Sequence, residues 1–172
     1  MQPQIQRFEL EGIQLIDIKK FPDERGFFAE SIRKDWSDLF ENDEWISQAN
    51  LSLSYPGIIR AWHRHARGQK DYFMVLQGAM KIVAYDDDKN SKTYKKLVEI
   101  VASEQRLQIV KIPGHYWHGT KTIGNKPSLT MYFVNNLYDY KNPDEERRAW
   151  DDPSIIDPKT KMTYDWNAPP HK

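Results

Sequence analysis

Residues 71–85 read DYFMVLQGAMKIVAY and contain two short runs rich in β-branched and aromatic residues, separated by Gln77-Gly78. Runs of this kind, bounded by turn residues, predict strands over Asp71–Leu76 and Ala79–Tyr85, with a hairpin at the Gln-Gly pair. Similar runs recur outward along the chain between Gly, Pro, Asn or Asp clusters, at Gly12–Lys19, Tyr94–Val101, Arg106–Ile112 and Ser128–Asn135. Strands spaced about every 8–12 residues predict an all-β sandwich or barrel rather than a βαβ fold.

The remaining segments predict fewer regular elements. The run DDDKNSK at 86–92 predicts a second hairpin loop. One helical pattern occurs, within Ser31–Trp45, because four apolar residues there fall on one helix face: Ile32, Trp36, Leu39 and Phe40. The C-terminal stretch is rich in Pro, Asp and Lys with little periodicity, which predicts an irregular tail lying over the body. No repeat or linker interrupts the chain, so one domain over residues 1–172 is expected.

Composition excludes several classes of protein. The 172 residues include 25 basic and 25 acidic side chains, so the chain lacks the basic excess expected of proteins that bind nucleic acid or anionic membranes. There is no cysteine, which rules out disulfides, a thiolate nucleophile and a thiolate metal site. The N-terminal MQPQIQRFEL resembles no leader peptide, and no apolar run approaches the ~18 residues of a membrane span. These features predict a cytoplasmic protein.

Four of the five histidines form two pairs, His63 with His65 and His115 with His118. Residues two apart on a strand share a face, so His63 and His65 are expected to point into one cavity, which His118 could reach from another strand. For His65 and His115 a structural, hydrogen-bonded role is the favoured alternative. Arg60 lies three residues before His63, so the two would face opposite sides of a regular strand unless a bulge intervenes.

A metal site is a second interpretation of the same histidines. Gly57, His63, His65, Asp71 and Gly78 approximate the spacing of the first metal motif of cupins. His118 follows Pro113 much as in the second motif, and imidazoles with one carboxylate suit a divalent metal. The acid, however, lies farther from His65 than that motif usually allows and is Asp rather than Glu. The preferred prediction is therefore a site without metal, and the alternative ligand set is His63, His65, Asp71 and His118.

Four stretches resemble the dTDP-4-dehydrorhamnose 3,5-epimerase family, in that family's order: FPDERGFFAES (21–31), QANLSLSYPGIIRAWH (48–63), IPGHYWHG (112–119) and AWDDPSI (149–155). Between the last two lies SLTMYFVNNLYDY (128–140), where that family places a strand with a catalytic tyrosine. The resemblance implies a cupin-like jelly-roll barrel that needs no cofactor and normally forms a homodimer. It also implies an isomerase of dTDP-rhamnose and polysaccharide biosynthesis, which inverts carbons beside the 4-keto group of a nucleotide-linked, most often dTDP-linked, 6-deoxy sugar.

The resemblance also assigns roles to residues. His63 matches the family's general base and Tyr132 its general acid, while a larger set matches substrate-binding positions: Arg25, Glu30, Gln48, Asn50, Arg60, Lys70, His118 and Tyr138. The chemistry suits these residue types, because an imidazole titrating near neutrality can remove the weakly acidic proton beside a ketone, and a tyrosine on the opposite face can return one. Two alternatives stay open: Arg25 pairing with Asp23 or Glu24 in its turn, and Tyr132 as a core aromatic.

Three departures from the family pattern bear on function. Asp71 stands where the family has a lysine near the substrate, with Lys70 one step earlier. The tail MTYDWNAPPHK lacks the family's aspartate that orients the histidine base, leaving Asp165 as a candidate. Ala61-Trp62 replaces a glycine and a smaller apolar residue. Two other functions are therefore weighed beside the epimerase and the metal-dependent cupin enzyme: a nucleotide-sugar 3,4-ketoisomerase and a non-catalytic sugar-nucleotide-binding cupin.

Overall fold

The computed structural model describes residues 2–40 and 44–169, and over these residues the chain is built of strands, turns and loops without a helix. The strands are β1 (Gln4–Arg7), β2 (Gln14–Asp17), β3 (Lys20–Asp23), β4 (Gly26–Ala29), β5 (Gln48–Ser54), β6 (Ile59–Arg64), β7 (Lys70–Gln77), β8 (Ala79–Tyr85), β9 (Leu97–Ser103), β10 (Gln108–Pro113), β11 (Trp117–Ile123), β12 (Ser128–Val134) and β13 (Glu146–Arg147). Nothing helical in the described chain has the length and apolar character needed to cross a bilayer.

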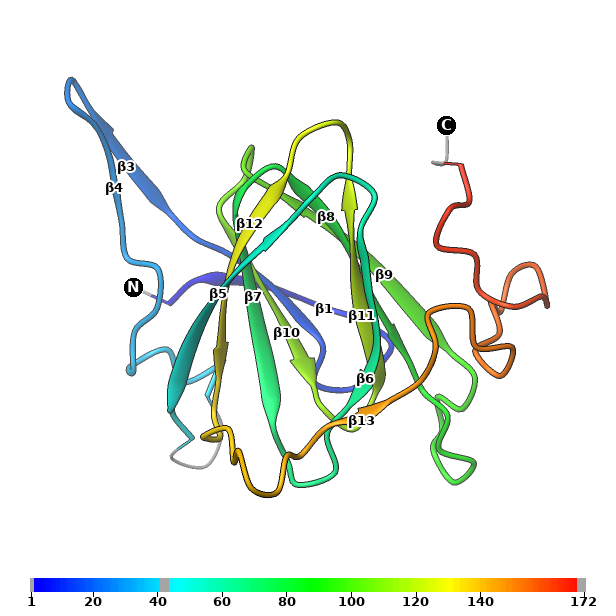
Figure 1. Ribbon diagram of the computed structural model, residues 1–172. Helices are drawn as coiled ribbons and strands as arrows, with labels where there is room; N and C mark the ends of the chain where they lie inside the picture. Colours follow the sequence, from blue (N-terminus) through cyan, green and yellow to red (C-terminus); the bar gives the residue numbers. More distant parts are fainter. Residues whose placement is uncertain (1, 41–43, 170–172) are drawn as a thin grey trace.

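Two antiparallel sheets face each other (Figure 1). One has the strand order β1-β2-β10-β7-β12-β5 and the other β13-β6-β11-β8-β9, while β3 and β4 form a separate hairpin that projects away from both. Apolar side chains from both sheets meet between them, among them Val75, Ile82, Ile100 and Val110. The all-β, cupin-like fold class is thus confirmed, with the barrel formed as two facing sheets that are not joined by hydrogen bonds into a closed cylinder.

The predicted strands correspond closely to β2, β7, β8, β9, β10 and β12. The hairpin loop at 86–92 is confirmed, because β8 pairs with β9 on either side of it. The hairpin at Gln77-Gly78 is wrong, since β7 and β8 lie in different sheets. Gly78 has φ +74° and exchanges hydrogen bonds with Glu104, and a Cβ on it would lie 2.4 Å from the Pro127 carbonyl oxygen. The glycine therefore forms a crowded corner between the sheets.

The predicted helix over Ser31–Trp45 is also wrong. Residues 31–40 form turns, and residues 41–43 of that range lie outside the described residues. The physical reason is that side chains from the sheet take the carbonyls a helix would use: Lys111 Nζ donates to the carbonyl of Leu39 at 2.7 Å, and Gln14 Nε2 to that of Asp38 at 3.2 Å. The apolar residues of this segment are nevertheless buried, since Trp36, Leu39 and Phe40 pack against the six-stranded sheet.

The C-terminal tail is irregular, as predicted, and packs on the outer face of the five-stranded sheet (Figure 1). Its Ile155, Tyr164 and Trp166 are buried against Trp62 of β6. The ring centroids of Trp62 and Trp166 are 4.8 Å apart, and both side chains are fully buried. The tail thus supports from behind the strand that carries His63.

Candidate active site

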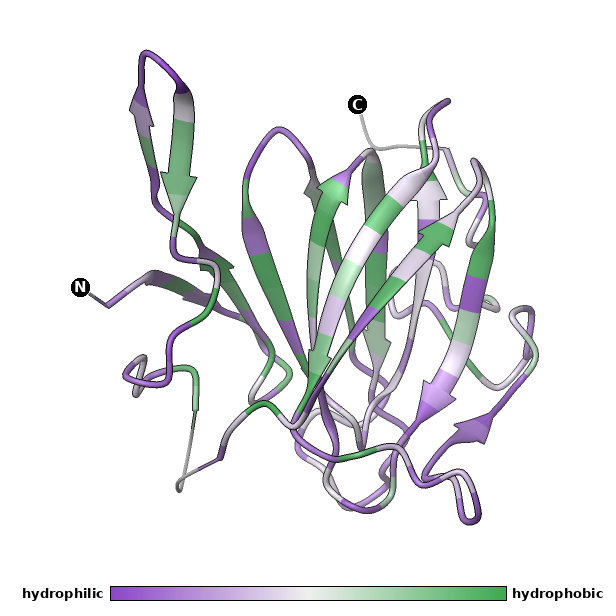
Figure 2. Ribbon diagram, turned by 60° about the vertical axis from the view of Figure 1, so that its left-hand side comes forward, coloured by the Kyte–Doolittle hydropathy of each residue, from purple (hydrophilic) through white to green (hydrophobic). Residues whose placement is uncertain are grey.

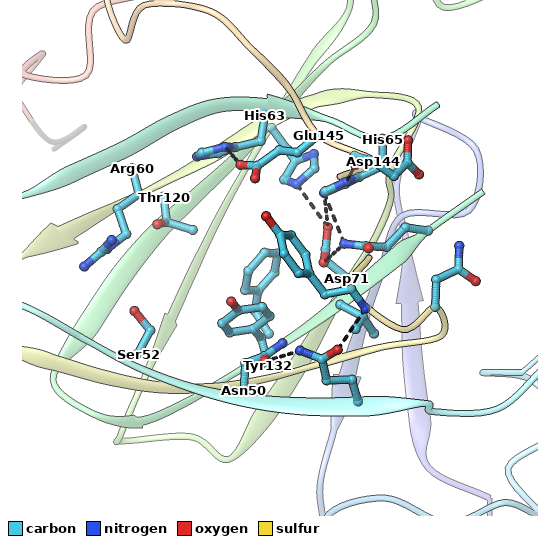
Figure 3. Close-up of a pocket in the computed structure, with 18 of the residues that line it drawn as sticks. Asn50, Ser52, Arg60, His63, His65, Asp71, Thr120, Tyr132, Asp144 and Glu145 are labelled. Atoms are coloured by element: carbon cyan, nitrogen blue, oxygen red, sulfur yellow. Dashed lines mark hydrogen bonds and ion pairs between the residues drawn. The ribbon is translucent and has the colours of Figure 1, made fainter. Parts of the chain in front are cut away.

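A cavity of about 1150 Å³ lies between the two sheets and is lined from β5, β6, β7, β11, β12 and the segment from 135 to 148. Figure 3 shows the polar side chains that converge on it. Of the residues predicted from the sequence to form the site, seven line this cavity: Gln48, Asn50, Arg60, His63, His118, Tyr132 and Tyr138. The cavity thus gathers distant parts of the chain: Gln48 Oε1 accepts a hydrogen bond from the Tyr138 N–H, ninety positions away.

A bulge in β6 lets Arg60 and His63 reach the same cavity. In the pairing with β11, His63 lies opposite His118 and Ala61 opposite Gly119, so Trp62 is an extra residue without a partner across the ladder. The intervening Trp62 side chain turns to the tail side, and the residues before and after it face the cavity. Of the two arrangements that the sequence left open, the bulge is the one observed.

His63 is held by a carboxylate. Its Nδ1 lies 2.5 Å from Glu145 Oε1, which as an ionised acceptor places the proton on Nδ1 and leaves Nε2 to exchange a proton with a ligand. Burial lowers the pKa of His63 below its usual value and nearby His118 lowers it further, while Glu145 opposes both effects. His63 is therefore neutral at physiological pH, the state required of a general base.

Glu145 owes its position to β13, which pairs with β6 so that Arg147 lies opposite His63. Burial alone would raise the pKa of Glu145, but hydrogen bonds from Arg147 together with the adjacent His63 lower it, so the carboxylate stays ionised. Asp165, the candidate from the sequence for this role, is exposed and accepts a hydrogen bond from the Asn167 N–H instead. The carboxylate that holds His63 therefore comes from the segment before AWDDPSI and not from MTYDWNAPPHK.

Tyr132 projects from β12 in the sheet that faces His63, and Figure 3 shows the two side chains on opposite sides of the cavity. Burial raises the pKa of Tyr132, and the negative charges of Asp71 and Glu145 raise it further. The phenol consequently remains protonated at neutral pH and is a competent proton donor. Its ring also contacts Phe73, with centroids 5.9 Å apart, so the side chain serves packing as well.

Asp71, and not Lys70, faces the cavity. The Asp71 carboxylate is buried, with Oδ2 3.1 Å from His118 Nε2 and 3.4 Å from His65 Nε2. Burial alone would raise the pKa of Asp71, but the two imidazoles outweigh it and hold the pKa well below its usual range. Lys70 is not among the cavity-lining residues, and its Nζ lies 2.7 Å from Glu44 Oε2.

The chain was compared with known proteins. The family model described as dTDP-4-dehydrorhamnose 3,5-epimerase matches residues 7–163. This chain belongs to that family. A curated relative, the probable low-salt glycan biosynthesis epimerase Agl13 of Haloferax volcanii, is 41% identical over 162 residues, which are 94% of this chain and 97% of the relative. As a member of the family the chain is an isomerase of the epimerase class.

Solved structures of epimerases share the fold. The dTDP-4-dehydrorhamnose 3,5-epimerase of Bacillus anthracis, solved with TDP and PPi, has a TM-score of 0.79 at 26% identity, covering 90% of this chain and 89% of that one. The dTDP-6-deoxy-D-glucose-3,5-epimerase of Legionella pneumophila, in complex with dTDP-4-keto-L-rhamnose, has a TM-score of 0.78 at 26% identity, covering 88% and 80%. The architecture that positions His63 and Tyr132 is thus shared with an epimerase solved with a nucleotide sugar and with one solved with TDP and PPi.

Besides Lys70, two predicted substrate-binding residues of this epimerase, Arg25 and Glu30, do not line its cavity. Arg25 lies in the turn of the β3–β4 hairpin and pairs with Asp23 at 2.5 Å, the alternative considered from the sequence. Glu30 follows β4 and pairs with Arg33. His115 also lies outside the cavity and contacts the Tyr116 ring, which is tilted 48° to it, whereas His65 lines the cavity and donates from Nδ1 to the Asp144 carbonyl.

Glu145 is the site residue that sequence reasoning missed. Its only local signal is the acidic run DEE at 144–146, which lies just before the AWDDPSI stretch and resembles any solvated acidic segment. The contact with His63 joins residues 82 positions apart, so it exists only after β13 has paired with β6.

Proposed function

We propose that this epimerase acts on a nucleotide-linked 4-keto-6-deoxy sugar, with dTDP as the preferred nucleotide. It inverts the carbon at position 3, position 5 or both. The observation that carries the proposal is the His63–Glu145 pair on one sheet facing Tyr132 on the other across a single cavity. The Legionella and Bacillus relatives, solved with dTDP-4-keto-L-rhamnose and with TDP and PPi, support the dTDP-linked substrate.

The proposed reaction is a proton exchange at a carbon beside the ketone. His63 Nε2 removes the proton, and the C–H bonding electrons pass into the ring to form an enolate whose negative charge lies mainly on the keto oxygen. Glu145 stabilises the imidazolium that results, because its carboxylate accepts from Nδ1 at 2.5 Å. Tyr132 then donates its phenolic proton to the same carbon from the opposite face, which inverts the centre.

The remaining lining residues suit a polar, anionic ligand. Arg60, Arg147 and Arg148 line the cavity and supply positive charge for a diphosphate. Gln48 is hydrogen-bonded to Asn50 at 2.7 Å and to the Tyr138 N–H at 3.0 Å, so these polar groups are held in place before a ligand arrives. A volume of about 1150 Å³ accommodates a sugar together with its nucleotide.

We further propose that two copies assemble. The edge strand β5 turns Gln48, Asn50 and Ser52 into the cavity, while Leu51 and Leu53 on its outer face are 63% and 50% exposed. An edge strand with an exposed apolar face is a liability unless another surface covers it.

The projecting hairpin carries a second exposed apolar surface, with Phe27 and Phe28 57% and 65% exposed, visible as a hydrophobic strand in Figure 2. In a homodimer each surface could be buried against the other copy. The hairpin that carries Arg25 would then lie on the partner subunit. Light scattering should give about twice the chain mass of 20.4 kDa, and Leu51→Lys should shift it toward the monomer. A wild-type monomer would refute the assembly.

We also propose a cytoplasmic location, from the sequence features described above.

The activity is tested by NMR of dTDP-4-keto-6-deoxyglucose in deuterated buffer with the wild type and with His63→Ala. Loss of the proton signal at carbon 3, carbon 5 or both, absent with the variant, is the expected result. Migration of the keto group to carbon 3 would instead identify a ketoisomerase. Binding without any exchange would identify a non-catalytic sugar-nucleotide protein, and repeating the measurement with the GDP-linked analogue tests the nucleotide.

A further inference from the structure

We propose that His65, Asp71 and His118 bind one divalent transition-metal ion, Zn²⁺ by preference, on the wall of the cavity. His65 directly follows β6, while Asp71 and His118 lie in β7 and β11, and the side-chain ligand atoms of all three lie within 4.8 Å of one another. All three are buried, at 9%, 3% and 3% exposure, and all three line the cavity.

The hydrogen bonds of the two histidines aim the same ring atom inward. His118 Nδ1 donates to the Tyr116 carbonyl at 2.9 Å, and His65 Nδ1 donates to the Asp144 carbonyl. A carbonyl can only accept, so each Nδ1 carries a proton, and each Nε2 is directed at Asp71, where it can offer its lone pair to a cation. A carbonyl partner on the opposite ring nitrogen is the usual way in which proteins orient a histidine that binds metal.

Asp71 completes this arrangement with an oxygen that has no well-formed hydrogen bond. Its Oδ1 accepts from Gln69 Nε2 at 3.0 Å, whereas the buried Oδ2 meets only the two Nε2 atoms, at 3.1 and 3.4 Å. Gln69 Nε2 also lies 3.2 Å from His65 Nε2, which is longer than its 3.0 Å contact with Asp71 Oδ1. A buried carboxylate oxygen beside two imidazole nitrogens requires a positive charge, supplied either by a metal ion or by a proton on one of the rings.

The distances favour a metal ion over a protonated imidazole. A charged N–H···O bond is about 2.7–2.9 Å long, shorter than either contact of Oδ2. Ligands at about 2.0–2.2 Å from a tetrahedral ion lie about 3.3–3.6 Å from each other, close to the separations of 3.1 and 3.4 Å. Two imidazoles with one carboxylate favour Zn²⁺ over Mg²⁺ or Ca²⁺, which prefer oxygen ligands alone.

His63 stays outside this site. Its ring centroid lies 6.3 Å from that of His118, and Glu145 holds its Nδ1. Three protein ligands leave a tetrahedral ion one open position, and because all three residues line the cavity, that position faces the space proposed for the sugar nucleotide. An ion there would add positive charge beside the substrate while the proton exchange at His63 proceeds separately.

The test measures metal rather than turnover, so its outcome is independent of the proposed epimerase activity. Protein purified through a cleavable tag without histidines is analysed by inductively coupled plasma mass spectrometry. About one equivalent of Zn²⁺ or a similar ion per chain is expected. Chelator-stripped protein is then titrated with Co²⁺, whose visible absorption reports tetrahedral nitrogen and oxygen ligation.

Variants locate the site. Asp71→Asn, which keeps the shape and removes the charge, and His118→Gln should each weaken Co²⁺ binding at least about 100-fold. His115→Gln is the matched control, a histidine from the same turn that does not line the cavity, and should bind as the wild type does. Circular dichroism checks that each variant folds. If a variant does not fold, the Co²⁺ titration of the wild type decides whether the protein binds metal.

Either of two results overturns the proposal. One is less than about 0.1 equivalent of metal in the purified protein together with no Co²⁺ uptake after stripping. The other is Co²⁺ binding of unchanged affinity in folded Asp71→Asn or His118→Gln. In both cases an imidazolium ion paired with Asp71 would replace the metal.

Discussion

Replacing Glu145 by Gln is expected to weaken the His63 base without moving it. The amide oxygen can still accept from His63 Nδ1, but the negative charge that favours the imidazolium is gone. Opposite unit charges about 4 Å apart attract by about 4 kcal/mol at an effective dielectric constant of about 20. Arg147 shares the carboxylate and the two side chains are 26% and 18% exposed, so about half of that, ~2 kcal/mol, is a reasonable expectation.

This free energy corresponds to about 1.5 pKa units, because one unit is 1.36 kcal/mol. Only part of this change in base strength reaches the transition state, so kcat/KM should fall about 5- to 15-fold. The sign of the pH effect is fixed as well. His63 acts when neutral, so activity rises with pH through its pKa, and loss of Glu145 lowers that pKa further. The acidic limb should therefore move to lower pH although the plateau falls.

The assay is kcat/KM for deuterium wash-out across pH. Glu146→Gln is the matched control, since that neighbouring carboxylate pairs with Arg64 at 2.6 Å rather than with His63, and its profile should match the wild type within about twofold. A Glu145→Gln enzyme with unchanged kcat/KM, or with its acidic limb moved to higher pH, would refute the role assigned to this carboxylate.

Four further substitutions test other parts of the structure. Tyr132→Phe should retain wash-out but lose inversion by about 100-fold or more, measured by NMR of the product stereochemistry. Gly78→Ala should cost about 3 kcal/mol or more in urea unfolding, because φ is +74° and the new Cβ would lie 2.4 Å from the Pro127 carbonyl oxygen. Gly124→Ala, with φ +80° and no atom within 4 Å, should cost only about 1–2 kcal/mol in the same experiment. Trp166→Ala should cost about 3–5 kcal/mol and lower the thermal midpoint, since the ring is fully buried against β6.

The sequence by itself predicted the longer strands of the two sheets and singled out several of the side chains that line the cavity. Alternating β-branched runs and the turn residues between them are local signals, so β8 was predicted over Ala79–Tyr85, the range observed. The spacing of His63 and His65 is equally local, and both line the cavity as expected. The family resemblance added Tyr132, whose place on β12 facing the histidines follows the same alternation.

Tertiary structure decided whatever depends on contacts between distant segments. Gln77-Gly78 has the composition of a hairpin, yet β7 and β8 find better partners in two different sheets. The pattern from Ser31 to Trp45 reported burial but not helix, because Lys111, more than seventy residues away, takes the Leu39 carbonyl. Neither outcome can be read from side chains that are neighbours in sequence.

The same holds within the site. Glu145 reaches His63, and Trp62 bulges out of β6, only because β13, β11 and the tail pack against one strand. The direction of a side chain within a strand is local and therefore predictable, whereas the partner it meets depends on register and loop closure over the whole chain. That physical difference separates His63, which the sequence singled out as a candidate base, from Glu145, whose contact with it only the fold revealed.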